Sequence, residues 1–444
     1  MMQMEFTYQD FLENYATDNS WLPERPLRPW EVIEQSKFPE DEAAIGKKHD
    51  RTIDALIKRM GEAYFEKFKR AKTLSLGYGG KMFPAYQLLF HDIACEDWLS
   101  LVDFHKGFGR DHSVHQPLTA YIVCKLLGRG RPNDAFHIRG NSLLDMALDT
   151  IMSVPDSQYL LDRLKHYDAL SPLLQGNREL WRQVFYQTTI VTAMYHDLGY
   201  PWQFIEKMHE TLKDDILLCG RLAYADPQRD PKANSIINPV VDNYIARHQD
   251  ELMFRPFYNY GKGGLTTASI NKKVFETNLH TSHGVPGALA YWAYNDAFIT
   301  STNATTGLIK FCQEWSCMAI LMHDMQKAYT QVDSGFARLD FNTDPLSFII
   351  ALADTLEDFN RPNASFKPDK DNPNGCKIEY SFPSLAVELV ENNGVAEIRY
   401  VVEKKETASQ RKFKSEDQVK LFNPGGYFDL NSIGLKSLTI NCID

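Results

Sequence analysis

The sequence contains few cysteines and no closely spaced pair of them. Its 7 cysteines are scattered along 444 residues, and no Cys-x-x-Cys motif occurs. Disulfide-rich secreted domains and cysteine-based zinc sites both need cysteines in recognisable groups. The pattern therefore argues against both classes, and we expect a cytoplasmic protein.

The sequence also shows no signal-peptide pattern, no membrane-spanning run and no excess of positive charge, so we expect neither a secreted nor a membrane-spanning protein. Its first residues show no basic start followed by an apolar core, and no apolar run approaches the roughly 20 residues that cross a bilayer. The net charge of −10 argues against a general binder of nucleic acid or anionic membranes, whose surfaces are usually basic. Metal ions or clustered arginines and lysines would then have to attract any anionic substrate.

Helical periodicity dominates what is present. Apolar residues recur at i, i+3 and i+4 around residues 118–126, 180–195, 311–322 and 348–356, a spacing typical of amphipathic helices. A similar stripe at 53–68 predicts a helix nearer the N-terminus. The chain is therefore predicted to be mainly α.

Composition divides the chain into three predicted parts. Residues 1–105 are expected to form an N-terminal helical extension, and residues 106–362 a helical domain with an insertion at about 198–279. A stretch rich in proline, asparagine and aspartate at 362–375 is typical of a linker. Residues 376–444 are expected to form a small α+β domain.

The α+β prediction depends on strand and turn signals that follow the linker. Asn392-Asn393-Gly394 predicts a tight hairpin turn, and a charged stretch at 409–421 predicts a helix. Short runs of β-branched and aromatic residues predict strands at 378–382, 386–390, 396–402 and 437–443.

Histidines and aspartates in the helical part occur in an order that suits a metal site. His196 and Asp197 end a long apolar run and precede Gly199, which allows the chain to turn away and leave both side chains at a cleft. Imidazole nitrogen and carboxylate oxygen suit divalent Mn, Fe, Co or Zn, and a carboxylate beside a histidine can bridge two ions. Two other dipeptides, His49–Asp50 and His91–Asp92, have no histidine at the expected earlier position.

Four more residues extend this pattern. His115 lies just before an apolar helical stripe, His283 lies four residues before Gly287, and His323 ends another apolar run. Asp354 follows several apolar residues, where a carboxylate is costly to bury unless it is paired or bound to a metal. Asp358, one turn later, is a candidate for orienting a ligand histidine.

Two of these positions have a competitor three residues earlier. His112 precedes His115, and His280 precedes His283. The earlier histidine of each pair is either the ligand or a contact to substrate in the same cavity. His323, taken alone, also fits a buried core histidine.

Five stretches, taken in order, resemble the HD-domain superfamily of metal-dependent phosphohydrolases. They lie at 111–120, 194–199, 283–287, 319–323 and 352–358. The resemblance implies an HD-type helical bundle that holds one or two divalent ions, which could be Mn, Fe, Co, Zn or Mg. It assigns one ion to His115, His196, Asp197 and Asp354, and a second to Asp197, His283 and His323.

The resemblance also implies an enzyme that hydrolyses a phosphate ester, such as a nucleotide, with metal-activated water. Asp197 would be its central catalytic residue. Some family members have a lysine directly after the His-Asp-x-Gly core, whereas Tyr200 and Pro201 follow Gly199 in this chain. The residues expected to bind the substrate are Arg110, His112, Arg255, Lys262, His280, Lys327 and Arg361.

Two other classes of function stay open at this point. The same ligand order resembles di-iron oxygenases that share this helical architecture. A chain that binds a nucleotide without turnover would instead be a sensor, whose α+β domain would signal to a partner or form a homo-oligomer. In the leading interpretation the partner is a small phosphorylated substrate, with no membrane or nucleic acid involved.

Overall fold

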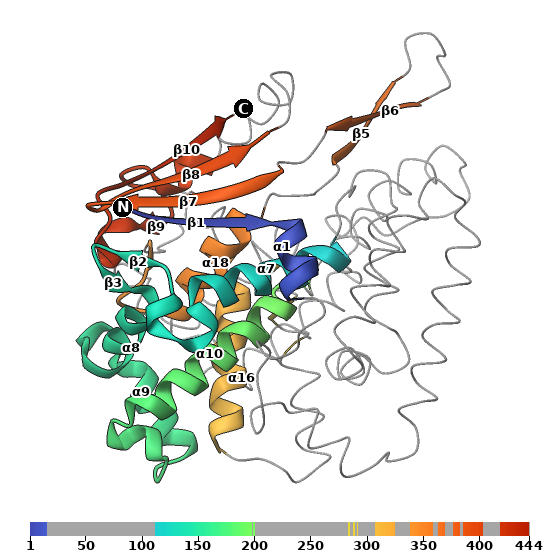
Figure 1. Ribbon diagram of the computed structural model, residues 1–444. Helices are drawn as coiled ribbons and strands as arrows, with labels where there is room; N and C mark the ends of the chain where they lie inside the picture. The colour runs from blue at the N-terminus through green and yellow to red at the C-terminus, as the bar shows by residue number, and fades with distance from the viewer. Residues whose placement is uncertain are drawn as a thin grey trace, which may run out of the picture.

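The computed structural model is helix-rich (Figure 1). Helices make up about 59% of the described residues and strands 19%, which agrees with the predicted helical character. No helix in the described part of the chain is long and apolar enough to cross a membrane. The described residues are 1–15, 112–197, 199, 283–284, 287–288, 291, 307–324, 338–357, 363–368, 376–381, 385–402 and 418–443.

Four helices form the centre of the helical part. They are α7 (His112–Leu126), α10 (Arg178–Tyr195), α16 (Gly307–Met322) and α18 (Pro345–Leu356). Helix α10 packs against the other three, and α18 also packs against α7 and α16. Each contains one of the apolar stripes found in the sequence, so these four predicted helices are confirmed.

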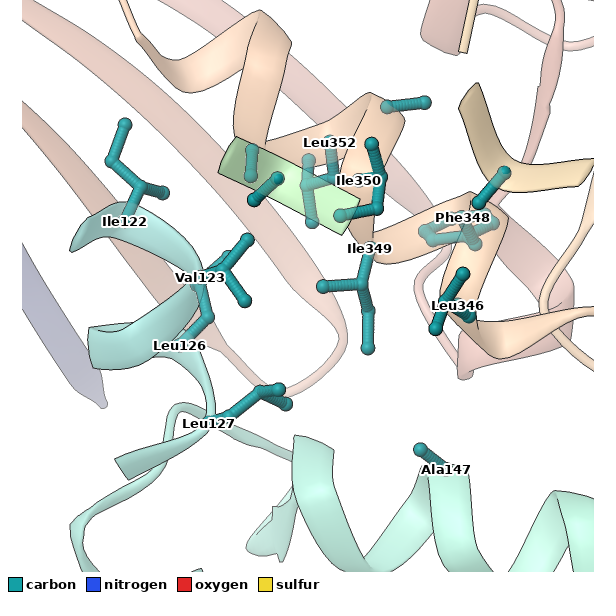
Figure 2. Packing of buried hydrophobic residues seen from close by; sticks show 14 of the residues in the cluster. Ile122, Val123, Leu126, Leu127, Ala147, Leu346, Phe348, Ile349, Ile350 and Leu352 are labelled. Atoms are coloured by element: carbon teal, nitrogen blue, oxygen red, sulfur yellow. The ribbon is translucent and has the colours of Figure 1, made fainter. Parts of the chain in front are cut away.

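Apolar side chains fill the space between α7 and α18. Figure 2 shows Ile122, Val123 and Leu126 of α7 on one side of this space and Ile349 and Ile350 of α18 on the other. All five side chains are fully buried. Burying a side chain of this size contributes about 1.5–3 kcal/mol relative to exposure, so this contact fixes how the two helices lie.

Two smaller helices, α8 (Leu143–Ser153) and α9 (Gln158–Tyr167), pack beside α10 and α16. An ion pair joins α9 to α16, with the Arg163 Nη2 atom 3.1 Å from Glu314 Oε1. Both side chains are buried. A buried pair of this kind is costly to break from one side, because the other charge stays in the interior.

A four-stranded sheet lies against the helices in the strand order β1-β7-β8-β10 (Figure 1). The strands are β1 (Met2–Thr7), β7 (Ala386–Asn392), β8 (Val395–Val401) and β10 (Ser437–Ile443). Strand β7 is antiparallel to β1 and β8, whereas β10 is parallel to β8. Asn393 and Gly394 in the turn between β7 and β8 have φ values of 53° and 84°. Positive φ at both positions suits the twist of a two-residue hairpin, so the predicted turn is confirmed.

Strand β1 differs from the predicted helical N-terminus. Residues Met2–Thr7 alternate between less and more exposed positions and pair along their whole length with β7. The following helix α1 (Tyr8–Asn14) is tied to α7, because Lys125 Nζ lies 2.7 Å from Asp10 Oδ2. The helix predicted at 53–68 lies outside the described residues.

The predicted linker also contains a strand. Strand β5 (Asn363–Pro368) pairs antiparallel with β6 (Cys376–Ser381), and Phe366 stands opposite Ile378. The prediction was wrong for residues 363–368, since turn-forming residues at 369–375 can close a hairpin as readily as they can form a linker.

Candidate metal centre

The ends of four helices bring the proposed ligands together. His115 lies in the first turn of α7, and Asp354 lies in the last turn of α18. His196 and His323 directly follow α10 and α16. All four positions therefore lie at or next to a helix end.

Two glycines allow His283 to approach this cluster. A Cβ atom at Gly199 would lie 1.8 Å from the His283 carbonyl oxygen, and one at Gly284 would lie 2.8 Å from the Leu321 carbonyl oxygen. A side chain at position 199 therefore cannot be accommodated without moving the backbone. Gly199, two residues after Asp197, therefore has a steric role at the centre.

The first half of the centre is formed by His115, His196 and Asp354. The Nε2 atom of His115 lies 3.1 Å from Nε2 of His196 and 2.9 Å from Oδ1 of Asp354. The same nitrogen lies 3.2 Å from Oδ2 of Asp197. These donor atoms converge closely enough to hold one ion.

The second half is formed by His283 and His323, whose Nε2 atoms lie 2.9 Å apart. Oδ1 of Asp197 lies 3.1 Å from His283 Nε2 and 3.6 Å from His323 Nε2. Asp197 thus directs Oδ2 toward His115 and Oδ1 toward His283 and His323. It is the residue common to both halves.

The outer nitrogen of each imidazole contacts an acceptor. The Nδ1 atoms of His115 and His283 face carboxylates, at 2.6 Å from Glu357 Oε2 and 3.0 Å from Asp324 Oδ2. The Nδ1 atoms of the two others face backbone carbonyls three residues earlier: His196 to Ala193 at 2.8 Å and His323 to Ile320 at 2.5 Å. A proton on Nδ1 satisfies all four acceptors and leaves each Nε2 as a lone-pair donor.

In this tautomer each Nε2 atom carries a lone pair, so the short distances between these nitrogens indicate what can lie between them. Lone pairs on Nε2 atoms about 3 Å apart repel one another unless a proton or a metal ion lies between them. Nitrogen donors about 2.0–2.1 Å from a shared ion are themselves roughly 3–3.5 Å apart, which is close to these distances. The imidazole and carboxylate donors therefore fit a first-row divalent metal in type as well as in spacing.

The electrostatics favour positive charge at the same place. Burial alone would raise the pKa of Asp197, but His196 and His115 hold it well below its usual range. The pKa of Asp354 is also well below its usual range, because in the metal-free centre protonated His115 and His196 rings donate to it and outweigh the effect of burial. A bound metal ion would take the place of those Nε2 protons. Both carboxylates are therefore ionised near neutral pH. Asp324 and Glu357 add two further acidic side chains around the imidazoles.

The structure brings together all six residues proposed as ligands. Arg110, Arg255, Lys262, His280, Lys327, Asp358 and Arg361 lie outside the described residues. His112 begins α7, but its side chain is outside the described part.

Sequence reasoning missed Glu357 and Asp324 as partners of ligand histidines. Glu357 lies three residues after Asp354, and Asp324 directly follows His323. The signal in the sequence was an acidic residue close to a presumed ligand, after Asp354 in one case and after His323 in the other.

No family model, curated protein or solved structure matches the chain. The resemblance to the HD-domain superfamily therefore stays a prediction from the sequence motifs. What the centre can do has to be argued from its own residues.

Proposed function

We propose that this protein is a metal-dependent phosphohydrolase with an HD-type helical bundle and a small C-terminal α+β unit. The observation that carries this proposal is the pair of facing imidazoles on each side of Asp197. His115 and His196 meet at 3.1 Å, and His283 and His323 meet at 2.9 Å. This arrangement of donors around a shared carboxylate suits a hydrolase with two adjacent metal positions.

The chain's residues divide between two positions. His115, His196, Asp197 and Asp354 would hold the first ion, and Asp197, His283 and His323 the second. Divalent ions bound there supply Lewis acidity that activates water and offsets the negative charge of a phosphate ester. Glu357 and Asp324 keep the His115 and His283 rings in the orientation that presents Nε2 inward.

Access for substrate is expected on the side of Asp354. Its side chain is 33% exposed, whereas that of Asp197 is 3% exposed. Among the described residues the second position has three protein ligands rather than four, which leaves more of its coordination sphere for water and substrate. A small phosphorylated substrate would therefore approach from Asp354 toward the second position.

The test compares metal content and hydrolysis in one preparation. The protein is stripped with a chelator, reloaded separately with Mn, Fe, Co, Zn or Mg, and assayed with phosphate monoesters and diesters, including nucleotides. The matched variants are Asp197→Asn in the centre and Asp145→Asn, whose carboxylate pairs with Arg178 at the surface. Loss of metal and hydrolysis in Asp197→Asn alone is the expected result.

Other results would favour the alternatives. Full hydrolysis by Asp197→Asn would exclude the proposed chemistry. Dioxygen consumption by the iron-loaded protein, without phosphate release from any ester, would support an oxygenase. Tight nucleotide binding without turnover under every metal would support a sensor.

A further inference from the structure

Tyr427 connects the C-terminal segment to the end of α16. Its hydroxyl donates a hydrogen bond of 2.5 Å to the carbonyl oxygen of Met322, and the contact is buried. Met322 is the last residue of α16 and is followed by His323 and Asp324. One of these residues is a proposed ligand of the second position, and the other contacts the His283 ligand.

The hydroxyl satisfies a carbonyl that the helix itself leaves free. The last four carbonyls of a helix have no partner within it. At the end of α16, the Ala319 carbonyl accepts from the His323 backbone and the Ile320 carbonyl accepts from the His323 ring. The bond from Tyr427 to Met322 then fixes the peptide that leads directly into His323.

The tyrosine also lies near Asp324. Burial raises the pKa of Tyr427 well above its usual range, and the charges of Asp324 and Asp344 raise it further, so the phenol remains a donor. Asp324 Oδ2 accepts from the His283 backbone at 2.9 Å and lies 3.0 Å from His283 Nδ1. A shift of the Met322–Asp324 backbone would therefore disturb both imidazoles of the second position.

The backbone around Tyr427 is held independently of its hydroxyl. The Leu339 nitrogen donates to the Tyr427 carbonyl at 2.7 Å. Arg338 donates to the Gly426 and Phe428 carbonyls at 2.8 and 2.5 Å. Replacing Tyr427 by phenylalanine should thus keep the segment in place and remove only the bond to α16.

We propose that Tyr427 is a positioning residue for the second metal position. It holds the end of α16 so that His323 and Asp324 lie where the centre needs them. The C-terminal segment is then a structural part of the metal centre and not only an appendage. This inference rests on the proposed function, because it assigns a role toward the second of the two proposed ions.

The experiment uses Tyr427→Phe in the full chain, with Tyr186→Phe as the matched control. The Tyr186 hydroxyl is also buried and lies 3.2 Å from Cys124 Sγ, on α10 well before His196. Metal-free protein is titrated with Co(II) by calorimetry and by absorption. In Tyr427→Phe we expect the second binding step to weaken about tenfold, as for loss of an outer partner of a ligand. The first binding step of Tyr427→Phe should have the same affinity as in the unmodified protein. Both binding steps of Tyr186→Phe should also be unchanged.

A readout without metal separates this inference from the proposed function. In metal-free protein labelled at histidine, the imidazole nitrogen signals of His283 and His323 should shift in Tyr427→Phe, while those of His115 and His196 should not. If the unmodified protein binds no second ion, the proposed function fails, and these signals still decide the role of Tyr427. The role of Tyr427 would be overturned if the His283 and His323 signals and the second Co(II) binding step were all unchanged in Tyr427→Phe. An equal weakening of both binding steps would also overturn it, as would the same weakening in Tyr186→Phe.

Discussion

Glu357 and His115 meet between α18 and α7, with Oε2 of the glutamate 2.6 Å from Nδ1 of the imidazole. The two residues are far apart in sequence, and both side chains are buried. A carboxylate at this distance keeps the ring in one orientation and makes Nε2 a stronger donor. The Glu357 carboxylate at the end of α18 therefore affects how strongly His115 of α7 can bind a metal.

Replacing this glutamate should weaken the first metal position. In Glu357→Gln the amide can still accept from Nδ1 but carries no charge, so we expect metal affinity to fall about 10- to 100-fold. Glu391→Gln is the control. Glu391 is also buried, but it lies in β7 and accepts from the Gly394 backbone at 2.6 Å, next to the β7–β8 turn. Equal metal affinity in the two variants would contradict the role given to Glu357.

Breaking the ion pair between α9 and α16 should destabilise the fold. Arg163→Met leaves the buried Glu314 carboxylate without this partner, and we expect the free energy of unfolding in urea to fall by about 3–5 kcal/mol. Adding Glu314→Leu removes the remaining charge and should recover most of the loss. A double variant as unstable as Arg163→Met would show that lost packing, and not the isolated charge, is the cause.

Adding one methyl group at Gly199 should disrupt the second metal position. The new Cβ atom of Gly199→Ala would overlap the His283 carbonyl oxygen, at 1.8 Å. His283 must move, and the variant should retain at most one ion per chain by elemental analysis. Gly140→Ala is the comparison, since no atom lies within 4 Å of a Cβ there. Its φ of 81° costs only the left-handed backbone term of about 1–2 kcal/mol.

Asp344 should make stability depend on pH. Burial raises the pKa of this N-cap carboxyl to about 6, despite hydrogen bonds from Ser347 and Trp315. Because the folded-state pKa exceeds the unfolded value of 3.8, the group's favourable contribution is complete below pH 3.8 and is lost as pH rises through 6.

Asp344→Asn keeps a good helix cap and removes this titration. Its stability relative to the unmodified protein should therefore increase by about 3 kcal/mol between pH 3.8 and pH 7. Urea unfolding at several pH values measures this difference. A difference that stays constant across this range would mean that Asp344 does not titrate there.

The sequence allowed the four central helices and the six clustered residues to be predicted for a physical reason. A helix that buries one face repeats its apolar residues at a fixed spacing, and a polar residue within such a run stands out. His196, Asp197, His323 and Asp354 were all found in this way.

Other features depend on partners that local patterns do not reveal. The strand Met2–Thr7 exists because β7 lies beside it, and residues 363–368 pair with β6, which comes later in the sequence. Glu357 was missed in favour of Asp358 because periodicity does not tell which of two adjacent acids at the end of α18 faces His115. Helix ends are set by capping contacts rather than by periodicity.

The position of β1 has a consequence for how the chain is made. Residues Met2–Thr7 are synthesised long before their hydrogen-bonding partner Ala386–Asn392. Until β7 is made, the earlier segment lacks this partner, and its backbone groups are available to other chains. Closing this sheet joins distant parts of the sequence, so it should be a late and slow event in folding. Fragments that stop before β7 should aggregate, even when their helices can form.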